Sequence, residues 1–332
     1  MHPLLATQKD AAAQSLTPDV HRYYAGGAGD QLSTTEAEQA WRDLRLRPRV
    51  LRDVGTVDTA VELLGTALRT PVLCGPTAAH GLAHPDGEAA TARGVAGAGS
   101  LLVLSSRSSV PVEQVQPPGP WWWQAYVVRD HGLTRERAAR AAAAGARAVV
   151  LTGDVPYLGA RHGATRLDLT GRPDPRDTQD PSIGLEAIAL LAEASGGLPV
   201  LVKGVLRADD ALACLEAGAQ GVVVSNHGGR QLDRAAPTAQ VLAEVAQAVG
   251  GRTPVLVDGG LRSGLDVLCA LALGADAVLL GRPVLWALAV AGADGVRDCL
   301  EAVTAELGHC MGLAGCASVR QVGADLLHLR RG

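Results

Sequence analysis

The chain has 332 residues, of which 47% are hydrophobic and 19% are charged, and its formal net charge is −4. This length and composition can supply one large domain or two ordinary ones, and the slightly acidic balance argues against a surface that binds nucleic acid. The chain contains no apolar run of eighteen or more residues and does not begin with a basic stretch followed by an apolar one. We therefore expect neither a membrane span nor a secretory signal.

The six cysteines are scattered and include no CxxC pair, which indicates reduced thiols in a cytoplasmic protein. His80, His84 and His162 are scattered loop histidines, and no set of His, Cys, Asp and Glu residues has the spacing of metal ligands, so no metal is expected. Because aromatic residues make up only 3% of the chain and Phe is absent, the core must be built from Leu, Val and Ala.

Residues 1–50 are polar and of helical character, with a break at the glycine-rich segment 25–30. Tyr23 and Tyr24 come directly before this break. Either the two rings pack the end of a helix that stops at glycine, which the residues alone favour, or one phenol enters a pocket. We expect this N-terminal segment to form a helical cap on the main fold.

From residue 71 onward, short apolar runs alternate with Ala- and Leu-rich segments of helical character. The apolar runs are eight predicted strands, at residues 71–76, 101–106, 121–127, 148–154, 199–204, 221–226, 254–260 and 277–282. Predicted helices between them include 134–145, 208–217, 238–249 and 264–273, and several of the helical segments end in a glycine just before the next strand.

Strands that alternate with helices predict an α/β fold with a parallel sheet, and eight such units fit a closed (β/α)8 TIM barrel. A doubly wound open sheet is the alternative. Polar or charged residues follow nearly every predicted strand, which favours the barrel, because an open sheet concentrates them at one switch point. We expect a single domain over residues 1–332, with residues 1–50 as the cap.

Residues 155–181 interrupt the alternation, since they are polar, rich in Gly, Pro, Asp and Arg, and without periodicity. A loop of this length is usually either functional or disordered. It follows the fourth predicted strand and would overhang the barrel mouth. A substrate-gating lid and a disordered insertion both fit this segment.

The segment 225–233 directly follows the sixth predicted strand and has the sequence SNHGGRQLD. His227 and Arg230 offer a general base and an anion-binding group three residues apart, which suits proton removal beside a bound carboxylate. Asp154 could orient the imidazole or form an ion pair at the barrel rim. Lys203 could form a structural ion pair with an aspartate or stabilise negative charge that develops on a bound cofactor.

The loops after the seventh and eighth predicted strands look like a phosphate site. Asp258, Gly259, Gly260 and Arg262 offer main-chain N–H groups at a glycine turn together with a cation, and Gly281 with Arg282 offers the same again. Barrels commonly bind phosphate at these two loops, so a phosphate-bearing cofactor or substrate is predicted.

The segment 225–233 resembles the signature of the FMN-dependent 2-hydroxy-acid oxidases and dehydrogenases, the family of glycolate oxidase, lactate oxidase and mandelate dehydrogenase. The likeness extends over residues 15–320 and includes the segments 23–30, 76–78, 84–88, 201–205 and 258–262. It implies a barrel that binds FMN and oxidises an (S)-2-hydroxy acid to the 2-oxo acid, with O2 as acceptor and H2O2 as product. It also implies a homo-oligomer, since barrels of this family are usually tetrameric.

Three alternatives stay open beside the oxidase. One is a dehydrogenase that passes electrons to a quinone or protein acceptor, although the chain shows no haem domain or membrane segment. Another is a specialised oxidase of a larger aryl or peptide-type hydroxy acid. The last is a flavin-binding barrel without redox turnover, against which the intact set of His227, Arg230, Lys203, Tyr126 and Asp154 argues.

The resemblance also implies roles for individual residues. The residues that would hold FMN are Pro76, Thr77, Ala78, Ser106, Gln124, Thr152, Lys203, Ser225, Asp258, Gly259, Gly260, Arg262, Gly281 and Arg282. Those that would surround the substrate are Tyr23, Arg107, Tyr126, Arg161, His227 and Arg230.

His227 would be the base that takes the proton of the substrate hydroxyl or of its α-carbon, and Asp154 would support it. Arg161 and Arg230 would bind the substrate carboxylate. Tyr23 and Tyr126 would form hydrogen bonds to the substrate, and Tyr126 would also take part in catalysis. Lys203 would stabilise the anionic reduced flavin.

The chain departs from the family pattern in its pocket wall. Arg107 stands where glycolate oxidases carry a bulky aromatic residue, Gly153 stands where a branched residue is common, and the loop after the fourth strand is shorter. We therefore expect a wider and more positive mouth, and a substrate that is larger than glycolate or lactate, carries a second anionic group or is tethered to a carrier. Ala78, which the family places near flavin N5, is compatible with direct reaction with oxygen.

Overall fold

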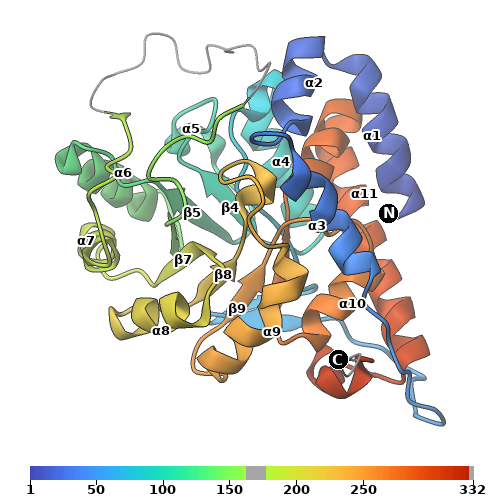
Figure 1. The fold of residues 1–332 in the computed structure, drawn as a ribbon. Helices are drawn as coiled ribbons and strands as arrows, with labels where there is room; N and C mark the ends of the chain where they lie inside the picture. The colour runs from blue at the N-terminus through green and yellow to red at the C-terminus, as the bar shows by residue number, and fades with distance from the viewer. Residues whose placement is uncertain (162–176, 329–332) are drawn as a thin grey trace.

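Eight parallel strands close into a barrel in the computed structural model, which describes residues 1–161 and 177–328 (Figure 1). Neighbouring strands follow the chain order, and Val278 of the last strand lies opposite Val72 of the first, which closes the ring. The strands are β3 (Val72–Cys74), β4 (Leu102–Ser105), β5 (Trp121–Ala125), β6 (Val149–Thr152), β7 (Val200–Val205), β8 (Val222–Val224), β9 (Val255–Val257) and β10 (Ala277–Leu280). Each overlaps one predicted strand, so the (β/α)8 barrel is confirmed and the open sheet is excluded.

Helices and short 3-10 turns lie between the strands of this barrel and after the last one (Figure 1). They are η1 (His80–Leu82), α4 (Gly87–Gly97), α5 (Val112–Val115), α6 (His131–Ala143), α7 (Glu186–Ala194), α8 (Ala208–Glu216), η3 (His227–Gly229), α9 (Thr238–Val249), α10 (Gly264–Ala272), α11 (Arg282–Ala314), η4 (Val319–Gln321) and η5 (Ala324–Leu326). The four predicted helices correspond to α6, α8, α9 and α10. Helix α6 begins earlier than predicted because the Asp130 side chain accepts a hydrogen bond from Leu133 N and caps it.

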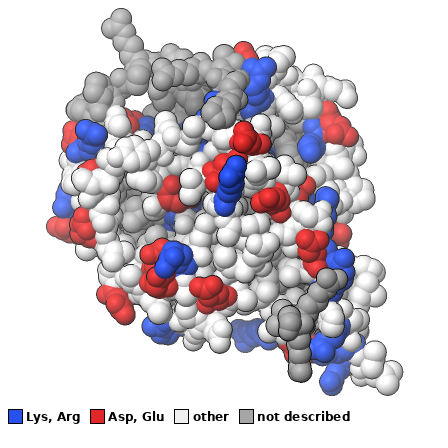
Figure 2. Space-filling model, in the orientation of Figure 1, with Lys and Arg blue, Asp and Glu red and all other residues white. Residues whose placement is uncertain are grey.

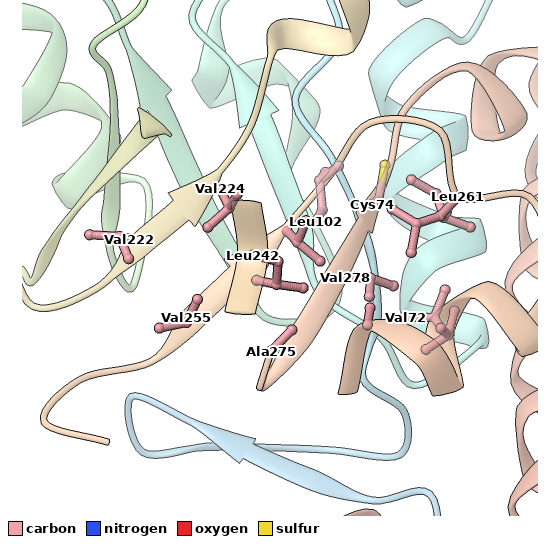
Figure 3. Packing of buried hydrophobic residues seen from close by; sticks show 14 of the residues in the cluster. Val72, Cys74, Leu102, Val222, Val224, Leu242, Val255, Leu261, Ala275 and Val278 are labelled. Carbon is pink, nitrogen blue, oxygen red and sulfur yellow. The ribbon is translucent and has the colours of Figure 1, made fainter. Parts of the chain in front are cut away.

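Alternation along each strand divides the barrel core into two layers. Leu73, Trp122 and Leu201 belong to a cluster inside the ring, whereas their strand neighbours, such as Val72 and Val202, belong to a cluster that faces the helices. Figure 3 shows the latter cluster between strands and helices. Because successive strand side chains point to opposite faces and both faces are covered, the strands are apolar throughout.

A short antiparallel hairpin, β1 (Val61–Leu63) and β2 (Thr66–Leu68), belongs to the inner layer. Leu63 and Leu68 pack in one cluster with Trp122 and other side chains from inside the ring. This hairpin could not be predicted, because strands of three residues carry too little alternation to be recognised.

Three N-terminal helices, α1 (Pro3–Ser15), α2 (Pro18–Ala25) and α3 (Leu32–Arg42), form the predicted cap. Helix α1 runs beside α11, where Gln8 Nε2 donates to Gly295 O at 3.3 Å (Figure 1). The end of α2 and the loop to α3 contact the loop after β8, since Ala28 N donates to Gly229 O at 2.8 Å. The cap therefore reaches the C-terminal ends of the strands.

The proposed lid over residues 155–181 falls mainly on 162–176, which lie outside the described residues. The described ends of this segment are fixed at the C-terminal side of the barrel. Gly29 N donates to Ala160 O at 2.8 Å on one side, and Asp180 N donates to Val127 O at 3.0 Å on the other.

Acidic and basic side chains are interspersed on the face that Figure 2 shows. This mixture is in keeping with the small net charge of −4. No helix within residues 1–161 and 177–328 combines the length and the apolar composition that a membrane span needs.

Candidate active site

The C-terminal ends of the eight strands converge on one end of the barrel because all strands run parallel. His227 follows β8 and Asp154 follows β6, and the fold brings their side chains together as expected. His227 Nδ1 lies 3.0 Å from Asp154 Oδ1 and 3.2 Å from Oδ2. A carboxylate at this distance requires the proton on Nδ1, which leaves Nε2 as the hydrogen-bond acceptor of a neutral imidazole.

Asp154 is mostly buried and held close beneath the base. Burial raises the pKa of its carboxyl, but the hydrogen bond from His227 and the positive charge of Lys203 outweigh this effect, so that the net shift is downward. Gly204 leaves the space for this side chain. Its φ is 109°, and a Cβ there would lie 2.5 Å from Asp154 Cβ.

Lys203 is 4% exposed and binds two groups at the strand ends. Its Nζ lies 2.8 Å from Asp258 Oδ2 and donates to Ser225 Oγ at 2.6 Å. Burial lowers the pKa of the ammonium, but attraction by Asp258 and Asp154 raises it to a greater extent, so Lys203 stays charged. The structural ion pair that the sequence left open is therefore present. Since an ammonium has three donors, a further one remains.

Ser225 links the cation to the base. Its Oγ accepts hydrogen bonds from Lys203 Nζ and from the main-chain N of His227, at 2.6 Å and 3.0 Å. His227 itself has a φ of 57°, in the left-handed region that non-glycine residues seldom adopt. The hydroxyl thus helps to hold a strained turn that directs the imidazole to Asp154.

Two guanidinium groups lie close to the ring of Tyr23. The Cζ atoms of Arg230 and Arg161 are 5.1 Å and 5.8 Å from its centroid. Burial, followed by repulsion from Arg161, lowers the pKa of Arg230 to about 10, which still leaves it charged at neutral pH. Arg161 Nε is buried and has no hydrogen-bond partner in the described part of the chain. Main-chain carbonyls bind the Arg230 guanidinium without cancelling its charge, since Nη1 donates to Tyr23 O at 2.8 Å and to Gly26 O at 2.9 Å. Two close cations therefore make a site for an anion.

The predicted phosphate residues lie together but are partly engaged by the cap. Arg282 donates from Nε to Tyr24 O at 3.0 Å, from Nη2 to Gly26 O at 3.0 Å and from Nη1 to Gly228 O at 2.9 Å. Burial, and then repulsion from neighbouring arginines, lowers its pKa to about 9. Three of its five N–H donors are used in this way, so two remain for a ligand.

Arg262 forms a contact that the sequence analysis did not anticipate. Its Nε lies 3.1 Å from Glu38 Oε1 on α3, and its Cζ lies 5.4 Å from the ring centroid of Trp286. The adjoining turn at Gly259 and Gly260 has φ values of 87° and 88°, and Trp41 Nε1 of the cap donates to Gly259 O at 2.7 Å. The cap therefore shapes the predicted phosphate loop.

A row of polar side chains joins the ends of β4, β5 and β6. Gln124 Nε2 donates to Thr152 Oγ1 at 2.7 Å, and its Oε1 accepts from Ser106 N at 3.3 Å. Tyr126 continues the row. Burial, followed by the negative charge of Asp154, raises the pKa of its phenol.

Arg107, which was expected to make the pocket wall cationic, is paired with a carboxylate. Its Nη1 donates to Asp177 Oδ2 at 2.5 Å, and Arg137 of α6 donates to the other oxygen of the same carboxylate at 2.5 Å. Its Cζ lies 5.7 Å from the ring centroid of Tyr126. The extra positive charge expected at the mouth is thus partly neutralised. This pair could not be predicted, because Asp177 lies in a loop without periodicity.

Two residues that hold neighbouring loops in place around the site were not predicted from the sequence to have a role. Asp233 accepts hydrogen bonds from Asp30 N and Ser33 N of the cap, both at 2.9 Å. Gln231 binds the loop after β6, accepting from Gly159 N at 3.2 Å and donating to Tyr157 O at 2.9 Å. Asp233 and Gln231 lie within the segment 225–233, and this position was the feature of the sequence from which their roles could have been predicted.

Tyr24 lies at the end of α2 with its hydroxyl donating to Ala79 O at 2.6 Å. Burial, followed by the Tyr23 and Glu88 charges, raises the pKa of this phenol. The two tyrosines therefore divide the two roles left open above, since Tyr24 packs the helix end and Tyr23 lies beside the arginines.

The residues at the strand ends fit a phosphorylated, hydroxyl-rich cofactor. Asp258 Oδ1 is buried without a hydrogen-bond partner among the residues described, and Lys203 and Arg282 each retain unused donors. A carboxylate oxygen needs a donor such as a sugar hydroxyl, and the cations suit a phosphate. Among residues 1–161 and 177–328, no group of three His, Cys, Asp or Glu side chains could hold a metal ion.

Comparison with known proteins identifies a family with such a cofactor. The family model described as FMN-dependent dehydrogenase matches residues 12–179 and 170–329. The chain is 38% identical to 2-hydroxyacid oxidase 2 of Rattus norvegicus, with 98% of each chain covered. It is 39% identical to an L-lactate oxidase of a Nostoc strain, with 92% of this chain and 93% of that protein covered.

Solved structures of mandelate oxidase have the same fold. One with (S)-mandelic acid bound superposes with a TM-score of 0.92 at 40% identity, over 99% of this chain and 98% of the other. Another, with an adduct of FMN, superposes with a TM-score of 0.91 at 40% identity, over 98% of this chain and 99% of the other.

Proposed function

The chain belongs to the FMN-dependent dehydrogenase family, and on this premise we propose that it oxidises (S)-2-hydroxy acids to 2-oxo acids, with O2 as the electron acceptor and H2O2 as the second product. The observation that carries the proposal is the position of the His227–Asp154 pair at the same barrel end as the arginines around Tyr23. A base next to an anion site is what removal of a proton from a hydroxy acid requires.

The cofactor is FMN, which supplies the two-electron acceptor for the alcohol and, through its reoxidation by O2, the peroxide. The residues proposed to hold it are Pro76, Thr77, Ala78, Ser106, Gln124, Thr152, Lys203, Ser225, Asp258, Gly259, Gly260, Arg262, Gly281 and Arg282. Asp258 Oδ1, which is buried without a hydrogen-bond partner in the described chain, supports this assignment.

Arg161 and Arg230 bind the substrate carboxylate in this proposal. Guanidinium groups match a carboxylate in shape, and buried ones bind it more strongly than exposed ones because water competes less. Tyr23 lies within reach of both arginines, and Tyr126 completes the polar row at the strand ends. Both phenols would donate hydrogen bonds to the bound acid.

His227 takes up one proton of the substrate at Nε2. Asp154 fixes the Nδ1–H tautomer through the 3.0 Å hydrogen bond and stabilises the imidazolium that results. Lys203 places a fixed positive charge at the strand ends, where it would offset the negative charge that the oxidation leaves behind. The hydroxy acid loses two electrons and two protons in total, and O2 receives them.

We further propose an aryl 2-hydroxy acid of the mandelate type as the substrate. The side chain of Arg107 supports this class, because its planar guanidinium lies 5.7 Å from the Tyr126 ring and offers a stacking surface in place of a bulky aromatic residue. A cytoplasmic location and a homotetramer are part of the proposal, and light scattering after size exclusion tests the assembly.

The test is anaerobic mixing of the FMN-loaded protein with glycolate, lactate, (S)-mandelate, (S)-4-hydroxymandelate and malate, followed by absorbance near ~450 nm, which reports oxidised flavin. Rapid bleaching by the aryl acids and rapid recovery in air are expected. Slow recovery in air would contradict O2 as the acceptor, and preference for glycolate or lactate would contradict the aryl class. Absence of bleaching by every acid would contradict the function.

Two histidine variants distinguish an enzyme that reduces its flavin with substrate from a protein that only binds flavin. His227→Ala should retain FMN and lose reduction by substrate, because the base is gone. The control is His309→Ala, at an exposed position on α11, which should behave like the parent protein. Reduction of His227→Ala at the parent rate would overturn the assignment of the base.

A further inference from the structure

A buried polar cluster contacts the turn formed by Pro76, Thr77 and Ala78. His80 and Glu88 are 2% and 1% exposed, although side chains of these types usually lie at the surface or only partly covered. In the sequence His80 is one of the scattered loop histidines, and the proposed reaction uses neither side chain. A buried ionisable pair this close to the cofactor loop therefore needs its own explanation.

The hydrogen bonds of His80 lead from α4 to Thr77. Its Nδ1 lies 2.8 Å from Thr91 Oγ1, and its Nε2 lies 2.6 Å from Thr77 Oγ1. Thr91 has a single hydroxyl proton, and its hydrogen bond to Gly87 O at 3.4 Å uses it, so we assign the proton between Thr91 and His80 to Nδ1. Burial lowers the pKa of His80 more than Glu88 raises it, so the imidazole is neutral and its Nε2 accepts.

This arrangement fixes the direction of the Thr77 hydroxyl. Its proton points to His80 Nε2, and only oxygen lone pairs are left for any other partner. A hydroxyl normally rotates to donate or accept as its partner demands. Here the rotation is locked by a side chain that is itself buried.

The surrounding backbone holds the turn in place. Ala79 has a φ of 59°. Its main-chain N donates to Arg107 O at 3.1 Å, and its main-chain O accepts from the Tyr24 hydroxyl at 2.6 Å. Glu88 Oε1 accepts from His80 N at 3.0 Å and from Ser109 N at 2.8 Å. A strained residue that is tied from several sides is typical of a functional turn.

We propose that His80 is a positioning residue that locks Thr77 as a hydrogen-bond acceptor toward bound FMN. The inference rests on the proposed function, in which Thr77 is one of the residues that hold the cofactor. A reduced flavin carries more N–H groups than an oxidised one, so a locked acceptor stabilises the reduced form relative to the oxidised form. His80 thereby raises the midpoint potential of the cofactor.

The test is the midpoint potential of the FMN-loaded protein, measured by chemical titration with a reference dye, in the parent protein, His80→Leu, Thr77→Val and the double variant. Loss of His80 frees the Thr77 hydroxyl to donate to the oxidised form. The oxidised-to-reduced equilibrium should shift by about tenfold toward oxidised FMN, which is about 30 mV for two electrons.

The double variant distinguishes positioning from a general structural effect. If His80 acts through Thr77, replacing it in the Thr77→Val background should change nothing further, whereas independent effects would add. His80→Met provides a second variant of similar size and without a strong hydrogen-bond acceptor should His80→Leu fold poorly, and it too should lower the potential. The control is His84→Gln, because His84 accepts from Asp86 N and makes no hydrogen bond to Thr77 in the described structure.

Unchanged potentials in both His80 variants, or additive shifts in the double variant, would overturn the inference. The titration needs no substrate, so it stays informative whichever acid is oxidised. Failure of every hydroxy acid to reduce the parent protein would instead overturn the proposed function and leave the potential measurement intact.

Discussion

Arg107 donates one hydrogen bond to the carboxylate of Asp177 and a second to its main-chain carbonyl, at 2.5 Å and 2.9 Å. Asp177 also binds Arg137, so one carboxylate compensates two guanidinium groups at the barrel mouth. Burial raises the pKa of Asp177, but the two arginines lower it further, which keeps it ionised. The net charge at this side of the barrel mouth therefore depends on Arg107, Arg137 and Asp177 together and not on Arg107 alone.

Asp177→Asn should make the mouth more positive and raise kcat/KM for a substrate with a second carboxylate, relative to (S)-mandelate, by roughly two- to fivefold at low salt. Steady-state rates on malate and (S)-mandelate at two ionic strengths measure this change. Glu193→Gln is the control, since Glu193 pairs with Arg135 at an exposed position. An equal effect on both substrates would contradict the electrostatic interpretation.

Asp154→Asn should slow reduction of the flavin by about a hundredfold, a smaller loss than that of His227→Ala. An amide cannot stabilise the imidazolium and does not enforce the Nδ1–H tautomer. Stopped-flow absorbance under anaerobic conditions measures the rate. Because the pKa of Asp154 is depressed, its carboxylate should stay ionised and stabilise the imidazolium of His227 down to acidic pH in the parent protein. A rate of flavin reduction that is unaffected by the substitution would exclude this role of Asp154.

Gly204→Ala should destabilise the protein by about 1–3 kcal/mol and displace Asp154, since the new Cβ would meet the Asp154 side chain and adopt a strained φ. Gly218→Ala is a matched control with a similar φ of 98° and no atom within 4 Å of the added Cβ. Chemical denaturation gives stability, and flavin reduction gives activity. Both variants should lose stability, but only Gly204→Ala should lose the fast reduction.

Asp233→Asn should weaken the attachment of the cap at neutral pH, and this effect should fade as the pH becomes acidic. Hydrogen bonds from main-chain N–H groups, led by that of Ser33, lower the pKa of Asp233. A depressed folded pKa adds stability above the unfolded value of about 3.9, and this stability is lost as pH falls through the folded pKa. Melting curves from about pH 3 to pH 7 should therefore fall less steeply for the variant than for the parent protein.

The barrel could be predicted because its strands are buried on both faces. The run 121–127 is apolar and bounded by turn residues, and it contains β5 (Trp121–Ala125). Parallel strands end on the same side, so residues as distant in sequence as Asp154 and His227 could be expected to meet. The hydrophobic pattern of a strand and the residues that end it are local features, so they can be recognised in a single sequence.

The contacts of the rim could not be predicted in the same way. Glu38 meets Arg262, Trp41 meets Gly259, and Asp177 meets Arg107, and each pair joins a strand end to a loop or cap residue far away in sequence. Such pairs depend on tertiary packing and leave no periodic pattern. His80 was missed for a related reason, since a histidine in a loop is buried only when neighbouring elements cover it.

The hydrogen bonds from Arg282 to Tyr24 O and Gly26 O join positions that are synthesised far apart in time. The carbonyls at the end of α2 emerge from the ribosome first, but their partner follows only after most of the barrel has been made. At about 5–20 residues per second the delay is on the order of 10–50 s. The cofactor site can therefore be completed only near the end of translation, and a nascent chain that stops before Arg282 lacks the link that joins its beginning to its last strand.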